Sequence, residues 1–304
     1  MPKLLLGSIS LCLDGDPRNE SRIKTHQTQL RWLESVGFKD YIYYRVEQKY
    51  TPEFREAVST SLNLESLSFD QGLGPAGARN ELLKKLYESD SDWLICMDDD
   101  RDLYSHYGAN EFLRNLAVNP ATIQLAKEGT LIVGVCPARR PFKKNNTEFG
   151  KIATHWNLIK GCIDGCLQIS CIPNIVKYGH KPIWFDATND CMHGKPPEDI
   201  QFELDWILAK HTLASNLMMI VRDIVPETYE VSTVYSSQEL RKEVMATHPK
   251  AINDYIKAHT RNRFTDVNAF NRLRNGFTAK AIPRLEPYTP VQSDYGKYLK
   301  LEEE

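Results

Sequence analysis

Four carboxylates lie within five positions of the sequence, directly after an apolar segment. In the stretch DWLICMDDDRDLY, the apolar run Trp93–Met97 is followed at once by Asp98, Asp99, Asp100 and Asp102. Carboxylates this close repel one another, and burying part of such a cluster is unfavourable unless a cation compensates the charge. The stretch therefore indicates a site that binds a cation.

The chemistry of the cluster favours a divalent metal ion. In an extended strand end, residues i and i+2 point to the same side, so Asp98 and Asp100 would face one ligand while Asp99 turns to a neighbouring group. Mn²⁺ and Mg²⁺ take oxygen ligands, and Mg²⁺ often uses only one or two carboxylates, with water and substrate phosphates completing its octahedron. The alternative is an acidic surface turn in which Asp102 caps a helix.

The bulk composition is that of a soluble protein with one large domain or two modest ones. The chain has 304 residues, of which 41% are hydrophobic and 26% are charged. The opening MPKLLLGSISLCLDG lacks the features of a signal peptide, and no segment reaches the roughly 18 apolar residues of a membrane span. Seven cysteines without tandem CxxC spacing indicate reduced, mostly buried thiols. We therefore predict a cytoplasmic protein without membrane insertion.

Strand and helix patterns alternate along the chain. The predicted helices are Asn19–Val36, Pro52–Ser61, Ala78–Glu88 and Glu198–Lys210, and a Gly-rich loop, GLGPAGARN, leads into the third of them. The predicted strands are Lys3–Cys12, Tyr41–Val46, Leu64–Phe69, Trp93–Met97, Thr130–Cys136, Ile163–Ser170 and Leu217–Val225. This order predicts an open, mainly parallel sheet with helices on both faces. In such sheets ligands bind beyond the carboxyl ends of the strands, where the acidic cluster lies.

A basic segment follows near the C-terminus. Residues 241–284 contain ten lysine and arginine residues but three acidic ones, and the cations alternate with Tyr255, Phe264, Phe270 and Phe277. Basic charge interleaved with aromatic rings suits a polyanion with exposed bases, such as nucleic acid. The alternative is an amphipathic helical pair that packs its aromatic rings on the core. The loop RRPFKKNN at Arg139–Asn146 would add a second basic contact.

Three motifs occur in a recognisable order between about Leu4 and His211. They are GPAGARNELLKKL…DSDWLICMDDD, KGCIDGCLQISCIPNIVKYG and PPEDIQFELDWILAKH. Together they resemble a GT-A glycosyltransferase of the family 2 type, in which a Gly/Ala-Arg-Asn helix start precedes the strand that carries the DxD motif. The resemblance implies an α/β fold with a mixed, mainly parallel sheet. It also implies a catalytic domain at 1–235, with a nucleotide-sugar-binding half at 1–104 and an acceptor half at 130–235. A basic helical extension at 236–283 and an extended or partly disordered tail at 284–304 would follow.

The resemblance implies a metal-dependent transferase that moves a sugar from a nucleotide-sugar, here expected to be a UDP-sugar, to an acceptor hydroxyl. Asp98 and Asp100 match the DxD motif and would hold Mn²⁺ or Mg²⁺ against the diphosphate. Arg79 would pair with the cluster or with a phosphate; otherwise it is a helix-start arginine in solvent. Asp199, or Glu198 beside it, matches the catalytic acid pair and would take the proton of the acceptor hydroxyl in an inverting enzyme. Otherwise the two are acids favoured by the helix dipole.

The remaining expected contacts concern the nucleotide and a third metal ligand. Those expected on the nucleotide-sugar are Ser8, Ser10, Asp14, Asp70, Gln71 and Asp99. His193 and His248 are the candidates for a third metal ligand, and we predict His248.

The acceptor is open on sequence grounds. The basic segment favours a hydroxymethylated base in viral DNA, which would have to be flipped out of the duplex. The alternatives are a saccharide or glycan acceptor, a nucleotidyltransferase that uses the same aspartates, and a non-catalytic nucleic-acid-binding module. The stretch SLCLDGDPRNE is acidic and poor in glycine, which counts against a nucleotidyltransferase.

Overall fold

The structure is a computed structural model that describes most of the first two thirds of the chain. It describes residues 2–13, 15–16, 18–103, 107–135, 168–188, 197–209, 211 and 213–223, and isolated positions between 243 and 254. The predictions for Asp14, His193 and His248, for the loop 139–146, and for nearly all of the basic extension and the tail lie outside these residues.

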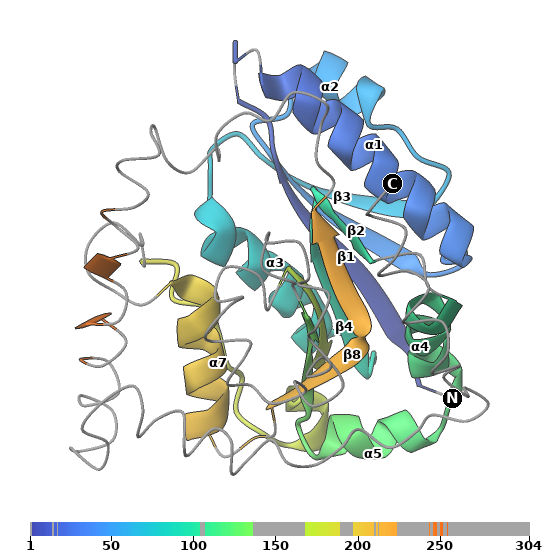
Figure 1. Cartoon of the computed structure of the whole chain (residues 1–304), viewed down its shortest axis with the longest axis vertical. Helices are drawn as coiled ribbons and strands as arrows, with labels where there is room; N and C mark the ends of the chain where they lie inside the picture. The colour runs from blue at the N-terminus through green and yellow to red at the C-terminus, as the bar shows by residue number, and fades with distance from the viewer. Residues whose placement is uncertain are drawn as a thin grey trace, which may run out of the picture.

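A mixed sheet runs through the described residues (Figure 1). Its strands lie in the order β3-β2-β1-β4-β7-β6-β8-β5. Neighbours among β3, β2, β1 and β4 are parallel, and so are β6 and β8, whereas β7 is antiparallel to both β4 and β6, and β5 is antiparallel to β8. The strands are β1 (Leu4–Leu11), β2 (Ile42–Gln48), β3 (Asn63–Phe69), β4 (Trp93–Asp98), β5 (Arg101–Leu103), β6 (Leu131–Val135), β7 (Ile169–Pro173) and β8 (Leu213–Asp223). Because β1 to β4 are parallel, their carboxyl ends meet at one edge of the sheet, the carboxyl edge.

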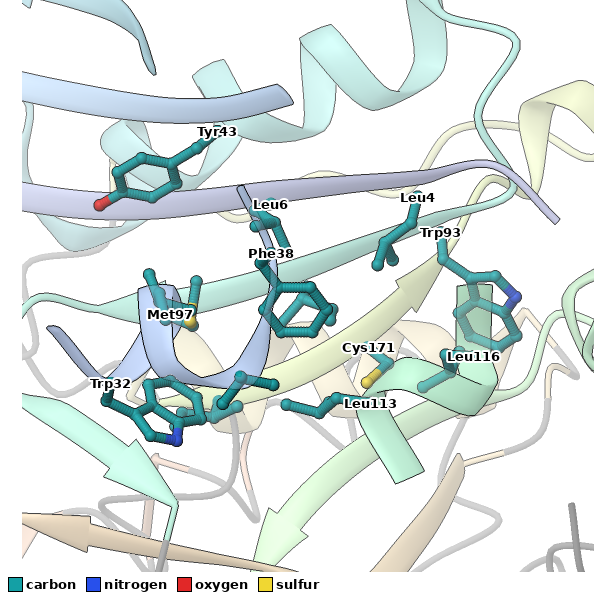
Figure 2. Close-up of a cluster of buried hydrophobic side chains, with 14 of the residues drawn as sticks. Leu4, Leu6, Trp32, Phe38, Tyr43, Trp93, Met97, Leu113, Leu116 and Cys171 are labelled. Atoms are coloured by element: carbon teal, nitrogen blue, oxygen red, sulfur yellow. The ribbon is translucent and has the colours of Figure 1, made fainter. Parts of the chain in front are cut away.

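Helices cover both faces of this sheet and form two cores. On one face lie α1 (Arg18–Val36), α2 (Pro52–Ala57), α4 (Tyr107–Val118) and α5 (Ala121–Lys127). On the other lie α3 (Gly74–Glu88) and α7 (Glu198–Leu208), and a short 3₁₀ turn, η2 (Val176–Tyr178), follows β7. Figure 2 shows the core on the α1 face, where Leu6 and Met97 of the sheet meet Trp32 of α1 and Leu113 of α4. In the described part of the chain, no helix combines the length and apolarity needed to span a bilayer.

Successive residues of β4 enter opposite cores. Ile95 and Met97 belong to the core on the α1 face, and Cys96 belongs to the core on the α3 face. Side chains alternate between the two faces along a strand. Asp98, the last residue of β4, therefore continues the row that faces α3, and Asp99 follows the row that faces α1.

The predicted fold class, an α/β fold with a mixed, mainly parallel sheet flanked by helices, is confirmed for the described residues. Several details differ. Helix α3 begins at Gly74 rather than Ala78, because Pro75 suits the first helical turn and extends the helix into the predicted loop. Helix α2 ends at Ala57, before the predicted Ser61. Strand β7 continues to Pro173 and runs antiparallel, and the short strand β5 was not predicted.

Candidate active site

The three consecutive aspartates have three different environments. β4 ends at Asp98, and the chain turns at Asp99 and Asp100 before β5 begins at Arg101. The Asp98 side chain is 19% exposed, the Asp99 side chain 11% and the Asp100 side chain 50%. The reason predicted for grouping Asp98 with Asp100, an extended strand through both, is wrong because this turn interrupts the strand. Both carboxylates nevertheless reach solvent at the carboxyl edge.

A buried arginine joins the donor and acceptor halves of the predicted site. Arg79 of α3 donates from Nη2 to Asp98 Oδ1 at 2.7 Å and from Nη1 to Glu198 Oε1 at 3.1 Å. Its side chain is 5% exposed, so the alternative of an arginine in solvent is excluded. One guanidinium therefore links β4 to the first residue of α7, through two charge-assisted contacts.

Aromatic packing holds Arg79 and α7 in place. The Phe185 ring lies 5.6 Å from the Arg79 guanidinium carbon and stacks on Phe202 of α7, with ring centroids 4.0 Å apart. Asn80 fixes the backbone of Phe185, donating to its carbonyl and accepting from its N–H, both at 2.8 Å. Neither Asn80 nor Phe185 was predicted from the sequence. Asn80 stands next to Arg79 in the Ala-Arg-Asn motif, which was the available signal.

Asp199 is a buried carboxylic acid at the start of α7. Its Oδ1 accepts from the Ile200 N–H at 2.8 Å, and the residue is 9% exposed. Burial raises the pKa of Asp199 well above its usual range, the charges of Glu198 and Glu203 add to this rise, and Arg79 opposes it. A carboxylate with a raised pKa is the more effective proton acceptor near neutral pH. Glu198 instead lies in an ion pair with Arg79. Of the two acids at the start of α7, Asp199 therefore has the raised pKa, and Glu198 is held in place by the arginine.

Asp98 is a partly buried carboxylate whose pKa stays raised even with Arg79 beside it. Burial raises its pKa to about 6, Asp100 adds to the rise, and Arg79 and Arg101 only partly offset it. A further cation at the carboxyl edge would therefore be favourable. Among the described residues, no group of three or more His, Cys, Asp or Glu side chains is arranged to hold a metal. Asp98 and Asp100 could supply two hard oxygen ligands to a divalent ion, which would take its other ligands from water and a diphosphate.

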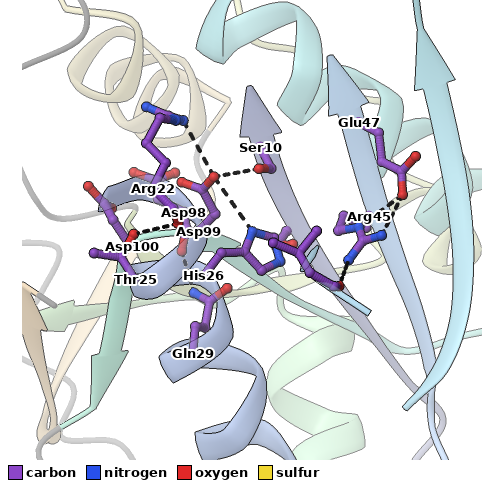
Figure 3. A network of polar contacts seen from close by, with 12 residues as sticks. Ser10, Arg22, Thr25, His26, Gln29, Arg45, Glu47, Asp98, Asp99 and Asp100 are labelled. Carbon is purple, nitrogen blue, oxygen red and sulfur yellow. Dashed lines mark hydrogen bonds and ion pairs between the residues drawn. The ribbon is translucent and has the colours of Figure 1, made fainter. Parts of the chain in front are cut away.

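Asp99 faces the opposite way, into a polar network under α1 (Figure 3). Ser10 of β1 donates to Asp99 Oδ2, Arg22 Nη2 lies 3.4 Å from the same oxygen, and His26 Nδ1 lies 3.7 Å from it. Although burial raises the pKa of Asp99, Arg22, His26 and Ser10 together lower it to about 2. The predicted contact of Asp99 with the nucleotide-sugar does not fit this inward orientation. Strand alternation is the physical reason.

The two serines of β1 are also turned inward. Ser8 is fully buried with its hydroxyl against that of Tyr43, and Ser10 is buried between Asp99 and Tyr50. Both continue the β1 row that faces α1, so the structure places neither hydroxyl where a nucleotide base would contact it. Asp70 and Gln71, by contrast, are exposed just beyond β3 at the carboxyl edge.

Comparisons with known proteins return distant structural likenesses. No family model and no curated protein matches the chain. TarS of S. aureus is 13% identical with a TM-score of 0.45, over 88% of this chain and 45% of TarS. GalNAc-T7, in a structure with UDP, GalNAc and Mn²⁺, is 9% identical with a TM-score of 0.48, over 90% of this chain and 55% of that one. A protein described as a nucleotide-diphospho-sugar transferase, from Desulfovibrio desulfuricans G20, is 9% identical with a TM-score of 0.41, over 83% of this chain and 99% of that one.

The chain thus spans less than half the length of TarS. Identities and TM-scores this low leave the function to be inferred from the chain's own residues.

The raised pKa of Asp199 predicts how the stability of the folded state changes with pH. The folded state holds the Asp199 proton more tightly than the unfolded chain, where the pKa is about 3.9, so stability falls as pH rises from there towards the raised value. Asp199→Asn removes this loss. Thermal unfolding followed by circular dichroism should show the variant gaining on the wild type as pH increases upwards from about 4. Asp40→Asn, at an exposed position before β2, is the control and should follow the wild type. Parallel curves for Asp199→Asn and wild type would contradict the assignment.

Proposed function

We propose that the protein is a metal-dependent glycosyltransferase that uses a nucleotide-sugar donor. The observation that carries the proposal is the pair of contacts made by Arg79. It places a partly exposed carboxylate of raised pKa, Asp98, beside a helix start that bears a buried acid of raised pKa, Asp199. A metal-binding carboxylate and a proton acceptor in one site are the two groups that metal-dependent, inverting sugar transfer from a nucleotide-sugar uses.

The donor would lie at the carboxyl edge. Asp98 and Asp100 would hold Mn²⁺ or Mg²⁺, which when bound stabilises the negative charge that develops on the departing diphosphate. Arg79 keeps Asp98 oriented through its 2.7 Å contact. The exposed Asp70 and Gln71 lie at the same edge, beyond β3, and would meet the nucleoside.

Transfer would take place between the donor and the start of α7. As the acceptor oxygen forms its bond to the anomeric carbon, the bond from that carbon to the diphosphate oxygen breaks. In an inverting reaction the acceptor proton passes to the Asp199 carboxylate, and the nucleoside diphosphate leaves with the bonding electrons. Glu198, held by Arg79, fixes the position of this helix start relative to Asp98.

A nucleotidyltransferase remains the alternative that uses the same aspartates. It would release pyrophosphate, whereas the proposed reaction releases a nucleoside diphosphate. The buried acid of raised pKa at Asp199 favours sugar transfer to a hydroxyl, because that reaction has an acceptor proton to remove.

The first test of the proposal is donor binding. UDP with Mn²⁺ should raise the melting temperature of the wild type by several degrees, since ligand at a hundred times its Kd adds about 2.7 kcal/mol of stability. UDP or Mn²⁺ alone should do less. Asp100→Ala should fold normally and lose the joint effect, because this side chain is half exposed, whereas Asp40→Ala should retain it. Unfolding of Asp100→Ala would assign the cluster a structural role instead.

The second test separates chemistry from binding. Asp199→Asn should lower kcat by a factor of about 10² to 10⁴, the usual contribution of a general base, while the Kd for donor stays near that of the wild type. The rates would be measured with a UDP-sugar and acceptor pair that the wild type turns over. A near-normal kcat would remove Asp199 from the role of base.

For the acceptor, we propose a hydroxymethylated base in duplex DNA, on the strength of the basic segment 241–284 in the sequence. The affinity of the full chain for such a duplex, measured by fluorescence anisotropy, should fall steeply with added salt because phosphate contacts release counterions. Replacing Arg261 and Arg263 by Ala should reduce the salt slope by about one per lost phosphate contact. Absence of binding at low salt, or binding that ignores salt, would point to a saccharide or glycan acceptor.

A further inference from the structure

Helix α1 carries polar side chains on the stripe that faces the sheet. Arg22, His26 and Gln29 follow one another at spacings of four and three residues, and the same stripe continues through Leu33 and Val36 in the core. His26 and Gln29 are fully buried. Apolar residues at these positions would contribute more hydrophobic stabilisation, so the polar stripe needs another explanation.

The polar stripe of α1 contacts the acidic turn at several points (Figure 3). The Gln29 side-chain amide donates from Nε2 to the backbone carbonyl of Asp98 and, at 2.7 Å, to that of Arg101. One amide group therefore ties the residue before the turn to the residue after it. Arg22 reaches the side chain of Asp99 inside the turn, at 3.4 Å.

Asp99 is held from the sheet as well. Ser10 donates to Asp99 Oδ2 and accepts from the Tyr50 hydroxyl at 2.7 Å. The backbone on either side of the turn is therefore bound to α1. The Asp99 side chain within the turn is bound to both β1 and α1. The two carboxylates on either side of Asp99 are the ones that reach solvent.

We propose that Gln29 and Asp99 are positioning residues for metal binding. They fix the backbone from Asp98 to Arg101 so that Asp98 and Asp100 present their carboxylates to the divalent ion together. This inference rests on the proposed function, which supplies the ion. Gln29 acts through its hydrogen bonds to the carbonyls of Asp98 and Arg101. Asp99 acts through the contacts of its buried side chain with Ser10 and Arg22. Partners of this kind, which orient metal ligands without touching the metal, typically account for a factor of about 10 to 100 in affinity.

Helix α1 offers a matched control for Gln29. Gln27, two residues earlier, also donates from Nε2 to a backbone carbonyl, that of Ala57 at 2.7 Å, at the end of α2. Gln29→Met and Gln27→Met therefore each remove a side-chain amide on α1 that donates to the main chain. Only the first releases the acidic turn.

The test measures Mn²⁺ affinity directly, without turnover. The electron paramagnetic resonance signal of free Mn²⁺ is titrated with the full chain in the presence of UDP. Gln29→Met should weaken Mn²⁺ binding about tenfold or more, and Gln27→Met should stay within about twofold of the wild type. Circular dichroism and melting temperature establish that each variant is folded. Ser10→Ala removes the hydrogen bond that Ser10 donates to Asp99 and should also weaken Mn²⁺ binding. If Gln29→Met does not fold, Ser10→Ala tests the positioning role in its place.

The outcomes separate the two proposals. A folded Gln29→Met that binds Mn²⁺ as the wild type does, or that is weakened no more than Gln27→Met, overturns the positioning role and leaves the proposed function standing. If Ser10→Ala binds Mn²⁺ with the affinity of the wild type, that result likewise overturns the positioning role and leaves the proposed function standing. A wild type that binds no Mn²⁺ with UDP overturns the proposed function, and the positioning role falls with it.

Discussion

The arrangement of the site depends on how β4 separates three adjacent negative charges. Strand alternation directs Asp98 to α3 and Asp99 to α1, and the turn leaves Asp100 at the surface next to Arg101. Each carboxylate then has its own cation: Arg79 for Asp98, Arg22 for Asp99 and Arg101 for Asp100. The compensation is unequal, since the pKa of Asp99 is lowered to about 2 while that of Asp98 stays raised to about 6. Asp98, the carboxylate whose charged form stays disfavoured, is therefore also the more exposed of these two.

The same separation explains how the two halves of the chain come into contact. Asp98 faces α3, so Arg79 reaches it there, and the second branch of the guanidinium extends to Glu198 at the start of α7. β7 pairs antiparallel with β4 and places the following segment along α3, where Asn80 binds the backbone of Phe185. Phe185 then stacks on Phe202 of α7. Aromatic packing thus positions the acid pair, and the arginine sets its distance from the carboxyl edge.

The sequence predicts individual strands and helices well because the spacing of apolar residues that marks each one is a local pattern. The strands and helices up to Met97 were placed to within a few residues, and the acidic cluster was placed at a strand end. The directions of individual side chains were predicted less well. An extended strand through Asp100 was predicted, although a turn intervenes, and Ser8 and Ser10 were expected to contact the nucleotide-sugar, although both are buried in the row that faces α1. The contact between Arg79 and Glu198 joins residues 119 positions apart, and no local pattern encodes it.

Buried polar groups make the free protein less stable than an apolar core would, and this bears on how ligands act. Burial lowers the pKa of His26 and raises the pKa of Asp98 and Asp199, so in each case the charged form is disfavoured inside the fold. The divalent ion of the proposed function would relieve the penalty at Asp98, and a ligand that binds only the folded state stabilises that state by mass action. It would leave the penalty at Asp199 in place, and the proposed reaction uses the basicity of that carboxylate to accept a proton. Under the proposed function, the site would combine one unfavourable charge, at Asp98, that the ion offsets with another, at Asp199, that persists for proton transfer, as expected where stability and activity oppose each other.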